Sequence, residues 1–172
     1  WCGSWRLLES YENHFWELPD WYLWVDLSQW LLDEAAKIFS EYEFIQWNML
    51  DIKNLTDEKK FNNIFLIASF HHLDSLPDRA ELLKDLKSLL TEWWKIYMTN
   101  WALESPVHKE KYKTSYKQWS ENKFWSKDFN IKFWEFNRYY HSFSLNELEY
   151  LAQESWLKII ENRLFDSQKN FI

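Results

Sequence analysis

Glycine is almost absent from this chain, which holds one glycine, one cysteine and three prolines in 172 residues. Average usage of about 7% would supply about a dozen glycines. The chain has 14 tryptophans instead, a surplus close to the glycine deficit. The single cysteine excludes an internal disulfide framework, and no Cys or His cluster has the spacing of a zinc site. We therefore expect a reducing, cytoplasmic setting and no metal.

Long apolar runs are also missing. No segment approaches the roughly 18 to 20 apolar residues that cross a bilayer, and no basic stretch followed by an apolar one opens the chain. The net charge of −7 argues against a protein that coats nucleic acid indiscriminately. Because 47% of the residues are hydrophobic, the chain can bury a core. We expect a single domain over residues 1–172 and no membrane partner.

Short apolar runs alternate with amphipathic segments along the whole chain. This alternation predicts an α/β fold with a doubly wound, mostly parallel sheet covered by helices on both faces. Strands are expected at residues 21–26, 44–46, 64–70, 95–99 and 157–162. Helices are expected from Ser28 to about Phe39, from Pro77 along a row of leucines to Leu90, and from Ser144 to about Ser155.

The segment from Ser105 to Tyr140 differs from the rest in charge. Its eight basic and four acidic residues give it a net charge of +4, so the remainder of the chain carries −11. Aromatic residues are interleaved with the lysines, and the segment is long for a connection between a strand and a helix. Two interpretations are open: a substrate-side insertion over residues 104–141, or a solvated helical excursion with lysines on its wet face.

Several tryptophans stand inside motifs that normally contain glycine. With glycine at positions 1 and 5, the opening WCGSWRLL resembles the glycine-rich first motif of class I S-adenosylmethionine (SAM)-dependent methyltransferases. The same exchange makes residues 22–28 resemble the second motif of that family and residues 46–51 the third. It also makes residues 92–96 and 155–158 resemble the later glycine positions. The resemblance implies a Rossmann-like, seven-stranded-type sheet, whose first strand we expect to be missing from the chain.

The resemblance also implies a SAM site, with S-adenosylhomocysteine (SAH) as the product. Asp26 ends the second strand of the family pattern, where a carboxylate accepts hydrogen bonds from the ribose hydroxyls; its alternative role is that of a carboxylate at a helix N-terminus. Asn48 and Met49 match the position beside the adenine. Ser69 and Phe70 would line the methyl end of the cofactor. The full set of expected cofactor residues is Trp1, Cys2, Gly3, Ser4, Trp5, Asp26, Leu27, Asn48, Met49, Ser69 and Phe70.

A narrower resemblance rests on three segments: FLIASFHHL at 65–73, NWALE at 100–104 and RYYHSF at 138–143. Together they are similar to the tRNA methyltransferases that esterify the carboxymethyl group of wobble uridine. The resemblance implies tRNA as a partner, with a small zinc-binding activator protein as a second. The acceptor would be held by His71, His72, Arg138, Tyr139 and His141, although the histidine pair and the tyrosines could instead be structural. Methyl transfer to a carboxylate needs no general base and depends on alignment and electrostatics.

Two other functions stay open at this point. The chain could be a small-molecule methyltransferase in which the insertion is a hydrophobic lid, or an inactive methyltransferase-like partner protein. Tryptophan in a left-handed turn would cost roughly 1–2 kcal/mol at each site. The exchange of glycine for tryptophan could therefore reflect engineering, a computed redesign or an error in the assignment of residues, with Trp101 and Trp21 as exceptions.

Overall fold

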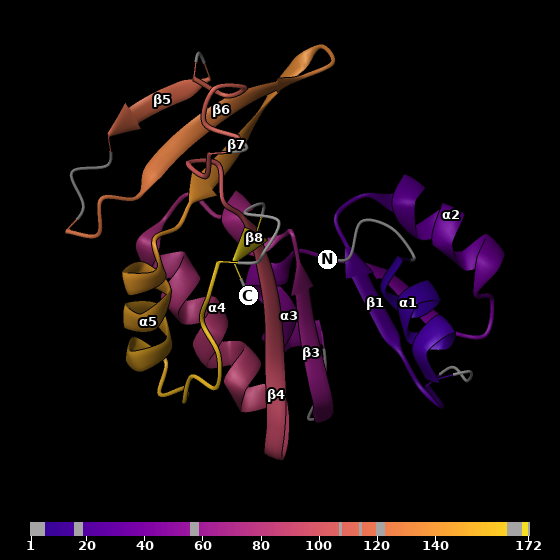
Figure 1. Cartoon of the computed structure of the whole chain (residues 1–172). Helices are drawn as coiled ribbons and strands as arrows, with labels where there is room; N and C mark the ends of the chain where they lie inside the picture. Colours follow the sequence, from indigo (N-terminus) through magenta and orange to yellow (C-terminus); the bar gives the residue numbers. More distant parts are fainter. Residues whose placement is uncertain are drawn as a thin grey trace. The chain divides into compact units, whose positions relative to one another are not determined.

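The computed structural model describes residues 6–15, 19–55, 59–106, 108–113, 115–119, 123–164 and 170–171. The chain divides into two compact units, Trp1–Lys59 and Lys60–Ile172 (Figure 1). Each unit is described by itself. In the described parts, no helix is long and apolar enough to cross a membrane.

Unit 1 is built on two parallel strands and the helices packed beside them. Strand β1 (Leu23–Asp26) pairs with β2 (Glu43–Gln46), and the connection between them contains α2 (Gln29–Ile38). Helix α1 (Arg6–Phe15) precedes β1, while a 3-10 turn η1 (Met49–Asp51) and α3 (Ile52–Leu55) follow β2. The core comprises Leu8, Trp24, Leu32 and Phe39, with Tyr22, Tyr42 and Phe44 packed against it.

Local sequence signals account for most of unit 1. The Ser28 hydroxyl accepts a hydrogen bond from the backbone N–H of Leu31 at 3.4 Å, which is the expected N-cap of α2. The strand expected at 21–26 is observed from Leu23, and the one expected at 44–46 begins one residue earlier. Strand, helix and parallel strand follow one another here as the sequence predicts.

Unit 2 contains a second parallel pair with a helix between its strands. Strand β3 (Phe61–Ile67) pairs with the long strand β4 (Leu90–Trp101), and β8 (Asn170–Phe171) lies antiparallel to β4. A 3-10 turn η2 (Phe70–His72) and helix α4 (Leu76–Leu89) connect β3 to β4. Helix α5 (Leu145–Glu154) packs beside α4 (Figure 1).

The basic segment of unit 2 forms an antiparallel sheet. Strands β5 (Tyr116–Trp119), β6 (Lys127–Phe133) and β7 (Phe136–Ser142) pair in the order β5-β6-β7. Its side chains Phe129, Ile131 and Tyr140 pack with Leu103 in a core cluster of their own. The helical interpretation of this segment is therefore wrong for the strands described here, because the apolar residues alternate along β6 with the period of a strand.

Two other expectations need correction. Residues 157–162 form no strand: Ile159 and Ile160 are exposed, and the backbone N–H of Leu157 bonds back to the carbonyl of Ala152 at 2.9 Å. The described strands also form three small sheets and not one continuous seven-stranded sheet. The expected strand at 64–70 is shifted, since β3 ends at Ile67 and residues 70–72 turn into η2.

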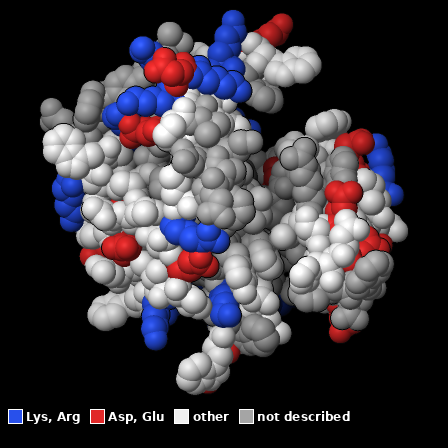
Figure 2. Space-filling view, viewed as in Figure 1, with Lys and Arg blue, Asp and Glu red and all other residues white. Residues whose placement is uncertain are grey.

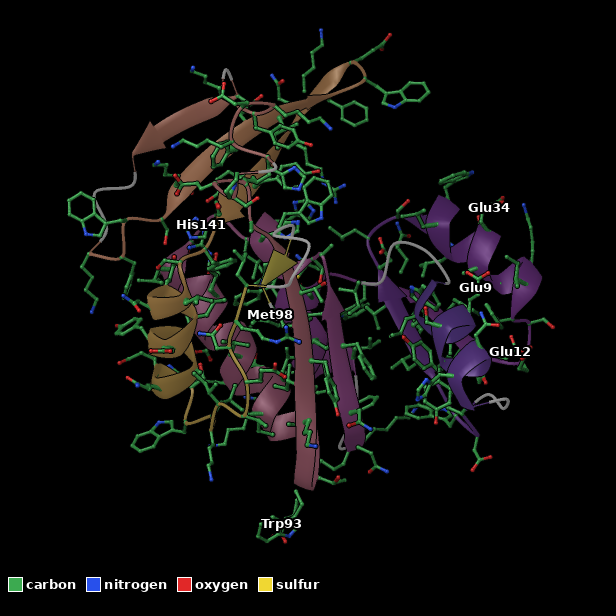
Figure 3. The ribbon with its side chains drawn as sticks, in the orientation of Figure 1. Glu9, Glu12, Glu34, Trp93, Met98 and His141 are labelled. Atoms are coloured by element: carbon green, nitrogen blue, oxygen red, sulfur yellow. The ribbon has the colours of Figure 1, made fainter. Side chains whose placement is uncertain are left out.

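Four tryptophans adopt the left-handed backbone conformation that glycine favours. The φ angles are 72° at Trp93, 60° at Trp125, 58° at Trp134 and 56° at Trp156, and all four side chains are exposed. Trp93 lies in the irregular stretch of β4, where the register against β3 shifts (Figure 3). Trp134 lies in the tight turn between β6 and β7, and Trp156 follows the end of α5. A bulge, a hairpin turn and a helix C-terminus are the places where glycine is normally found, so the expectation for Trp93 and Trp156 is confirmed.

Candidate functional site

The carboxyl ends of β1 and β2 bring together four of the residues expected to bind the cofactor. Asp26 and Gln46 are register partners at the last position of the two strands. The Asp26 carboxylate is buried, with 6% of the residue exposed, and accepts a hydrogen bond from the backbone N–H of Ser28 at 2.9 Å. A buried carboxylate at this edge of a parallel sheet is placed as ribose-binding carboxylates are in doubly wound folds.

Leu27, Asn48 and Met49 lie in the turns beside Asp26. The carbonyl of Leu27 accepts from the side-chain amide of Gln46 at 2.9 Å, and its own side chain is exposed. The Asn48 side chain caps η1 by accepting from the N–H of Leu50 at 3.1 Å, while Met49 is buried. Parallel pairing thus gathers residues from two turns, whereas the expected residues Trp1, Cys2, Gly3, Ser4 and Trp5 lie outside the described residues.

Ser69 and Phe70 follow β3 in a strained turn. Ala68, directly before them, has a φ of 50°. The Ser69 hydroxyl is buried, and no described residue partners it. Phe70 is fully buried and stacks on Phe143 with ring centroids 5.4 Å apart. The ring of Phe70 is therefore part of the unit 2 core, and the hydroxyl of Ser69 is the polar group at this position.

His71 and His72 make opposite hydrogen bonds to strands of two different sheets, β4 and β7. Nδ1 of His71 accepts from the backbone N–H of Trp101 at 3.2 Å, and Nδ1 of His72 lies 2.9 Å from the carbonyl oxygen of Tyr139. Burial lowers the pKa of His71 well below its ordinary value of 6.5, and His72 and Arg138 act in the same direction. His71 is therefore a buried neutral ring, held between β4 and its neighbour His72.

Tyr140 joins the histidine pair to the basic segment. Its ring stacks on Trp101 at 5.1 Å with an interplanar angle of 14°, and it also contacts the rings of His71 and His72 at 5.3 and 4.6 Å. The guanidinium of Arg138 lies 5.9 Å from the Tyr140 ring centroid, and Arg138 is exposed. Arg138 is thus a surface cation on an aromatic support, which suits the recognition of a carboxylate or phosphate.

Tyr139 and His141 belong to a different, buried arrangement of charges. Nδ1 of His141 lies 2.7 Å from Asp128 Oδ1, and Nε2 lies 2.8 Å from Glu147 Oε2 (Figure 3 labels His141). The Arg79 guanidinium bonds to Glu147 Oε1 at 3.1 Å and donates twice to the carbonyl of Leu73, at 3.0 and 2.7 Å. We call Arg79, Asp128, His141 and Glu147 the ion cluster.

Two hydroxyl groups, those of Tyr139 and Ser126, form further hydrogen bonds with the ion cluster. The Tyr139 hydroxyl donates to Asp128 Oδ1 at 2.6 Å and accepts from Arg79 Nη2 at 3.1 Å, and the Ser126 hydroxyl donates to Glu147. Although burial by itself raises the pKa of Asp128, hydrogen bonds from His141 and Tyr139 outweigh it and lower the pKa. Burial, followed by the hydrogen bond to Asp128, raises the pKa of the Tyr139 hydroxyl, which stays protonated.

The sequence analysis missed three members of the ion cluster as site residues: Arg79, Asp128 and Glu147. Glu147 stands three residues after Ser144 in a capping-box pattern, and the first half of that box is present, because the Ser144 hydroxyl accepts from the Glu147 N–H at 3.2 Å. The other half is replaced: the N–H of Ser144 donates to the Ser126 hydroxyl at 3.4 Å. The Glu147 carboxylate turns inward to Arg79 and His141 instead. Arg79 and Glu147 lie 68 residues apart on two different helices, so no local sequence pattern indicates that they form an ion pair.

The five residues expected to hold the acceptor therefore fall into three environments. His71 and His72 lie in an aromatic cluster, Arg138 lies on the surface above it, and Tyr139 and His141 take part in the buried charge arrangement. Lys and Arg side chains gather over the β5–β7 sheet (Figure 2). Within the residues that the structure describes, no group of three or more His, Cys, Asp or Glu side chains could hold a metal ion.

Comparison with known proteins supports the fold. No family model matches the chain, and no curated protein matches it in sequence. Among solved structures, a SAM-dependent methyltransferase from Methanosarcina mazei has a TM-score of 0.64 at 14% identity, over 87% of this chain and 76% of that one. The glycopeptide N-methyltransferase MtfA, complexed with SAH, has a TM-score of 0.62 at 14% identity, over 96% and 73%.

A third match comes from Burkholderia thailandensis. Its 1,6-didemethyltoxoflavin-N1-methyltransferase, with bound 1,6-didemethyltoxoflavin and SAH, has a TM-score of 0.64 at 14% identity, over 99% of this chain and 66% of that one. Identity at this level shows the fold alone. The chain has the α/β fold of SAM-dependent methyltransferases, with parallel strands and helices, which confirms the expected fold class in this coarser form.

Proposed function

We propose that this chain is a SAM-dependent methyltransferase whose acceptor is the carboxymethyl group of a wobble uridine in tRNA, in the cytoplasm. The main observation that supports SAM binding is the buried carboxylate of Asp26 at the carboxyl end of β1. Together with the exposed Asn48 after β2, it offers hydrogen-bond acceptors to a nucleoside, and Met49 is buried beside Asn48. The fold shared with SAH-bound methyltransferases supports the same assignment.

The proposed chemistry asks little of the protein beyond placement. SAM would supply an activated methyl group, and a carboxylate acceptor already carries the electron pair that forms the new bond. No side chain then has to remove a proton, and the protein contributes alignment and charge. Arg138 would neutralise the acceptor carboxylate or a phosphate, and the exposed lysines of residues 109–132 would neutralise the RNA backbone.

SAH binding to the full chain, measured by titration calorimetry, tests the cofactor assignment. We expect wild-type protein to bind SAH and Asp26→Asn to bind about 10-fold more weakly or worse, since a hydrogen bond to a charged group contributes about 1.5–3 kcal/mol. Asp33→Asn is the matched control, because Asp33 is exposed on α2 and accepts a hydrogen bond from Gln29, one turn earlier on the same helix. Absence of SAH binding by folded wild-type protein would contradict the assignment and favour an inactive partner protein.

Binding of an anticodon stem-loop at several salt concentrations tests the acceptor. Removing the exposed charges of Lys132 and Arg138 should weaken binding and reduce the salt dependence. Lys87→Ala, on the exposed side of α4, should change neither. Salt-independent or absent RNA binding by a protein that binds SAH would reject the tRNA acceptor.

A small-molecule acceptor is the second candidate. The matched Burkholderia enzyme holds 1,6-didemethyltoxoflavin, and MtfA is a glycopeptide N-methyltransferase. In that case the β5–β7 sheet would cover a small acceptor. We also propose a small zinc-binding activator protein as a partner, on the basis of the wobble-uridine resemblance; comigration of the two proteins in size-exclusion chromatography tests it.

A further inference from the structure

The two adjacent histidines of η2 carry their protons on different nitrogens. A carbonyl oxygen only accepts hydrogen bonds, so the contact of His72 Nδ1 with the Tyr139 carbonyl at 2.9 Å requires a proton on that nitrogen. A backbone N–H only donates, so the contact of His71 Nδ1 with Trp101 at 3.2 Å requires a lone pair there. In the neutral rings, the proton of His71 is on Nε2 and that of His72 is on Nδ1.

The carbonyl that bonds to His72 belongs to a residue that the ion cluster holds. The Tyr139 side chain is fixed by its two hydrogen bonds, to Asp128 at 2.6 Å and from Arg79 at 3.1 Å. His141, two residues further along β7, is fixed at both ring nitrogens by carboxylates. Strand β7 is therefore attached to β6 and to helices α4 and α5 at two successive inward positions.

Burial makes this attachment strong. Arg79 is 3% exposed, His141 1% and Glu147 0%. A buried charge that loses its partner is strongly destabilising, so the cluster has one well-defined arrangement. When both nitrogens of His141 carry protons, the two positive and two negative charges of the cluster balance, and every polar contact in it joins a donor to an acceptor.

We propose that the ion cluster is a positioning device for His72. By holding Tyr139 it keeps His72 in the Nδ1–H form, which leaves the lone pair of the ring on Nε2, a nitrogen that can accept a hydrogen bond from an N–H or O–H group of the substrate but not from its carboxylate. Tyr139 and His141 then act through His72 and do not touch the acceptor themselves. The functional part of this inference rests on the proposed methyl transfer, whereas the tautomer does not.

Histidine ring nitrogens can be observed directly in the full chain labelled with ¹⁵N-histidine. Correlation spectra of ring protons and nitrogens distinguish the two tautomers, and the His72→Gln variant assigns the signals by their loss. We expect the Nδ1–H form for His72 and the Nε2–H form for His71 in wild-type protein above neutral pH. An Nε2–H form for His72 would overturn the proposal without any variant.

Two variants test the link to the ion cluster. Tyr139→Phe removes one oxygen atom and leaves the backbone carbonyl, and Glu147→Gln removes the charge that Arg79 and His141 share. Each should convert the His72 signals into a mixture of tautomers while the His71 signals stay unchanged. Glu149→Gln is the matched control on α5, because Glu149 is exposed.

The outcomes separate this proposal from the proposed function. A single Nδ1–H form of His72 in folded Tyr139→Phe would overturn the link to the cluster, and equal changes at His71 and His72 would show a general structural effect instead. Should Glu147→Gln fail to fold, Tyr139→Phe alone decides. Since neither SAM nor RNA is present, failure of methyl transfer has no influence on these signals.

A second inference rests on the backbone and not on the site. Among the described residues other than glycine, five have positive φ, and four of them are tryptophans. Tryptophan is among the residues least suited to this conformation, and the chain has 14 tryptophans against one glycine. We infer that the organism that makes this protein places glycine at positions 93, 125, 134 and 156. The codon UGA, which some genetic codes read as tryptophan and others as glycine, would produce this exchange at many positions at once.

Mass spectrometry of the protein purified from its source tests the second inference. We expect an intact mass below 21.5 kDa by whole multiples of the difference between tryptophan and glycine, with glycine at these four positions in the peptides. Trp101, which stacks on Tyr140 at 5.1 Å, should remain tryptophan. Peptides with tryptophan at all four positions would overturn the inference.

Discussion

Arg79 and Glu147, 68 residues apart in the sequence, form a buried ion pair with Nη1 of Arg79 3.1 Å from Oε1 of Glu147. The pair joins helix α4 to helix α5, and Glu147 continues through His141 to the antiparallel sheet. The ion cluster thus couples the parallel part of unit 2 to its basic sheet.

Glu147→Gln should destabilise unit 2 strongly. The substitution leaves the buried guanidinium of Arg79 without its anionic partner, at a cost of about 3 kcal/mol or more. Urea denaturation followed by circular dichroism measures the change. Glu149→Gln, exposed on the same helix, should change the free energy of unfolding by less than about 0.5 kcal/mol. Equal effects of the two variants would contradict a special role of the buried carboxylate.

Replacing left-handed tryptophans by glycine should stabilise the chain. Trp93→Gly and Trp156→Gly remove a strained backbone conformation at exposed side chains and should each raise the free energy of unfolding by about 1 kcal/mol. Trp30→Gly is the control: Trp30 is also exposed but lies in the first turn of α2, so the same change should be neutral or lower stability by a few tenths of a kcal/mol. A loss of stability at position 93 or 156 would show that the indole ring contributes more than the strain costs.

Burial of His71 predicts a loss of stability in mild acid. Because the folded-state pKa of His71 lies well below 6.5, the unfolded chain binds a proton that the folded chain does not bind. The free energy of unfolding therefore keeps its full value above pH 6.5 and decreases as the pH falls below that value. His71→Gln should flatten the dependence of unfolding free energy on pH in this window, while His14→Gln, exposed on α1, should leave it unchanged. An identical slope in His71→Gln would contradict the buried neutral ring.

The lowered pKa of Asp128 predicts a second decrease in the free energy of unfolding, at a lower pH than that of His71. Its folded-state pKa lies below the ordinary value of 3.8, so its contribution is present above pH 3.8 and is lost as the pH falls through the folded-state pKa. Asp128→Asn should reduce the acid dependence in that range. Asp85→Asn on α4 supplies a comparison outside the ion cluster. Unfolding free energies at pH 2–5 in steps would resolve the two windows.

Local patterns predicted most secondary structure correctly because their causes lie within a few residues. Ser28 and Ser144 cap the helices that follow them, and Pro77 with the leucine row marks α4. The same locality explains the error at 157–162, where an apolar run reads as a strand. No partner strand covers Ile160 among the described residues, and the return of Leu157 to Ala152 ends α5 instead.

The sequence by itself determined the α/β class, the caps and the strand-end position of Asp26, since periodicity and capping are short-range, and the motif resemblance located two of the left-handed positions, Trp93 and Trp156. Only the tertiary structure decided that the basic segment is an antiparallel sheet and that Glu147 leaves its capping box for Arg79. It also decided that His71 and His72 differ in protonation site. The inward turn of Glu147 and the difference between the two histidines depend on hydrogen bonds between groups 30 to 68 residues apart, which no local pattern specifies.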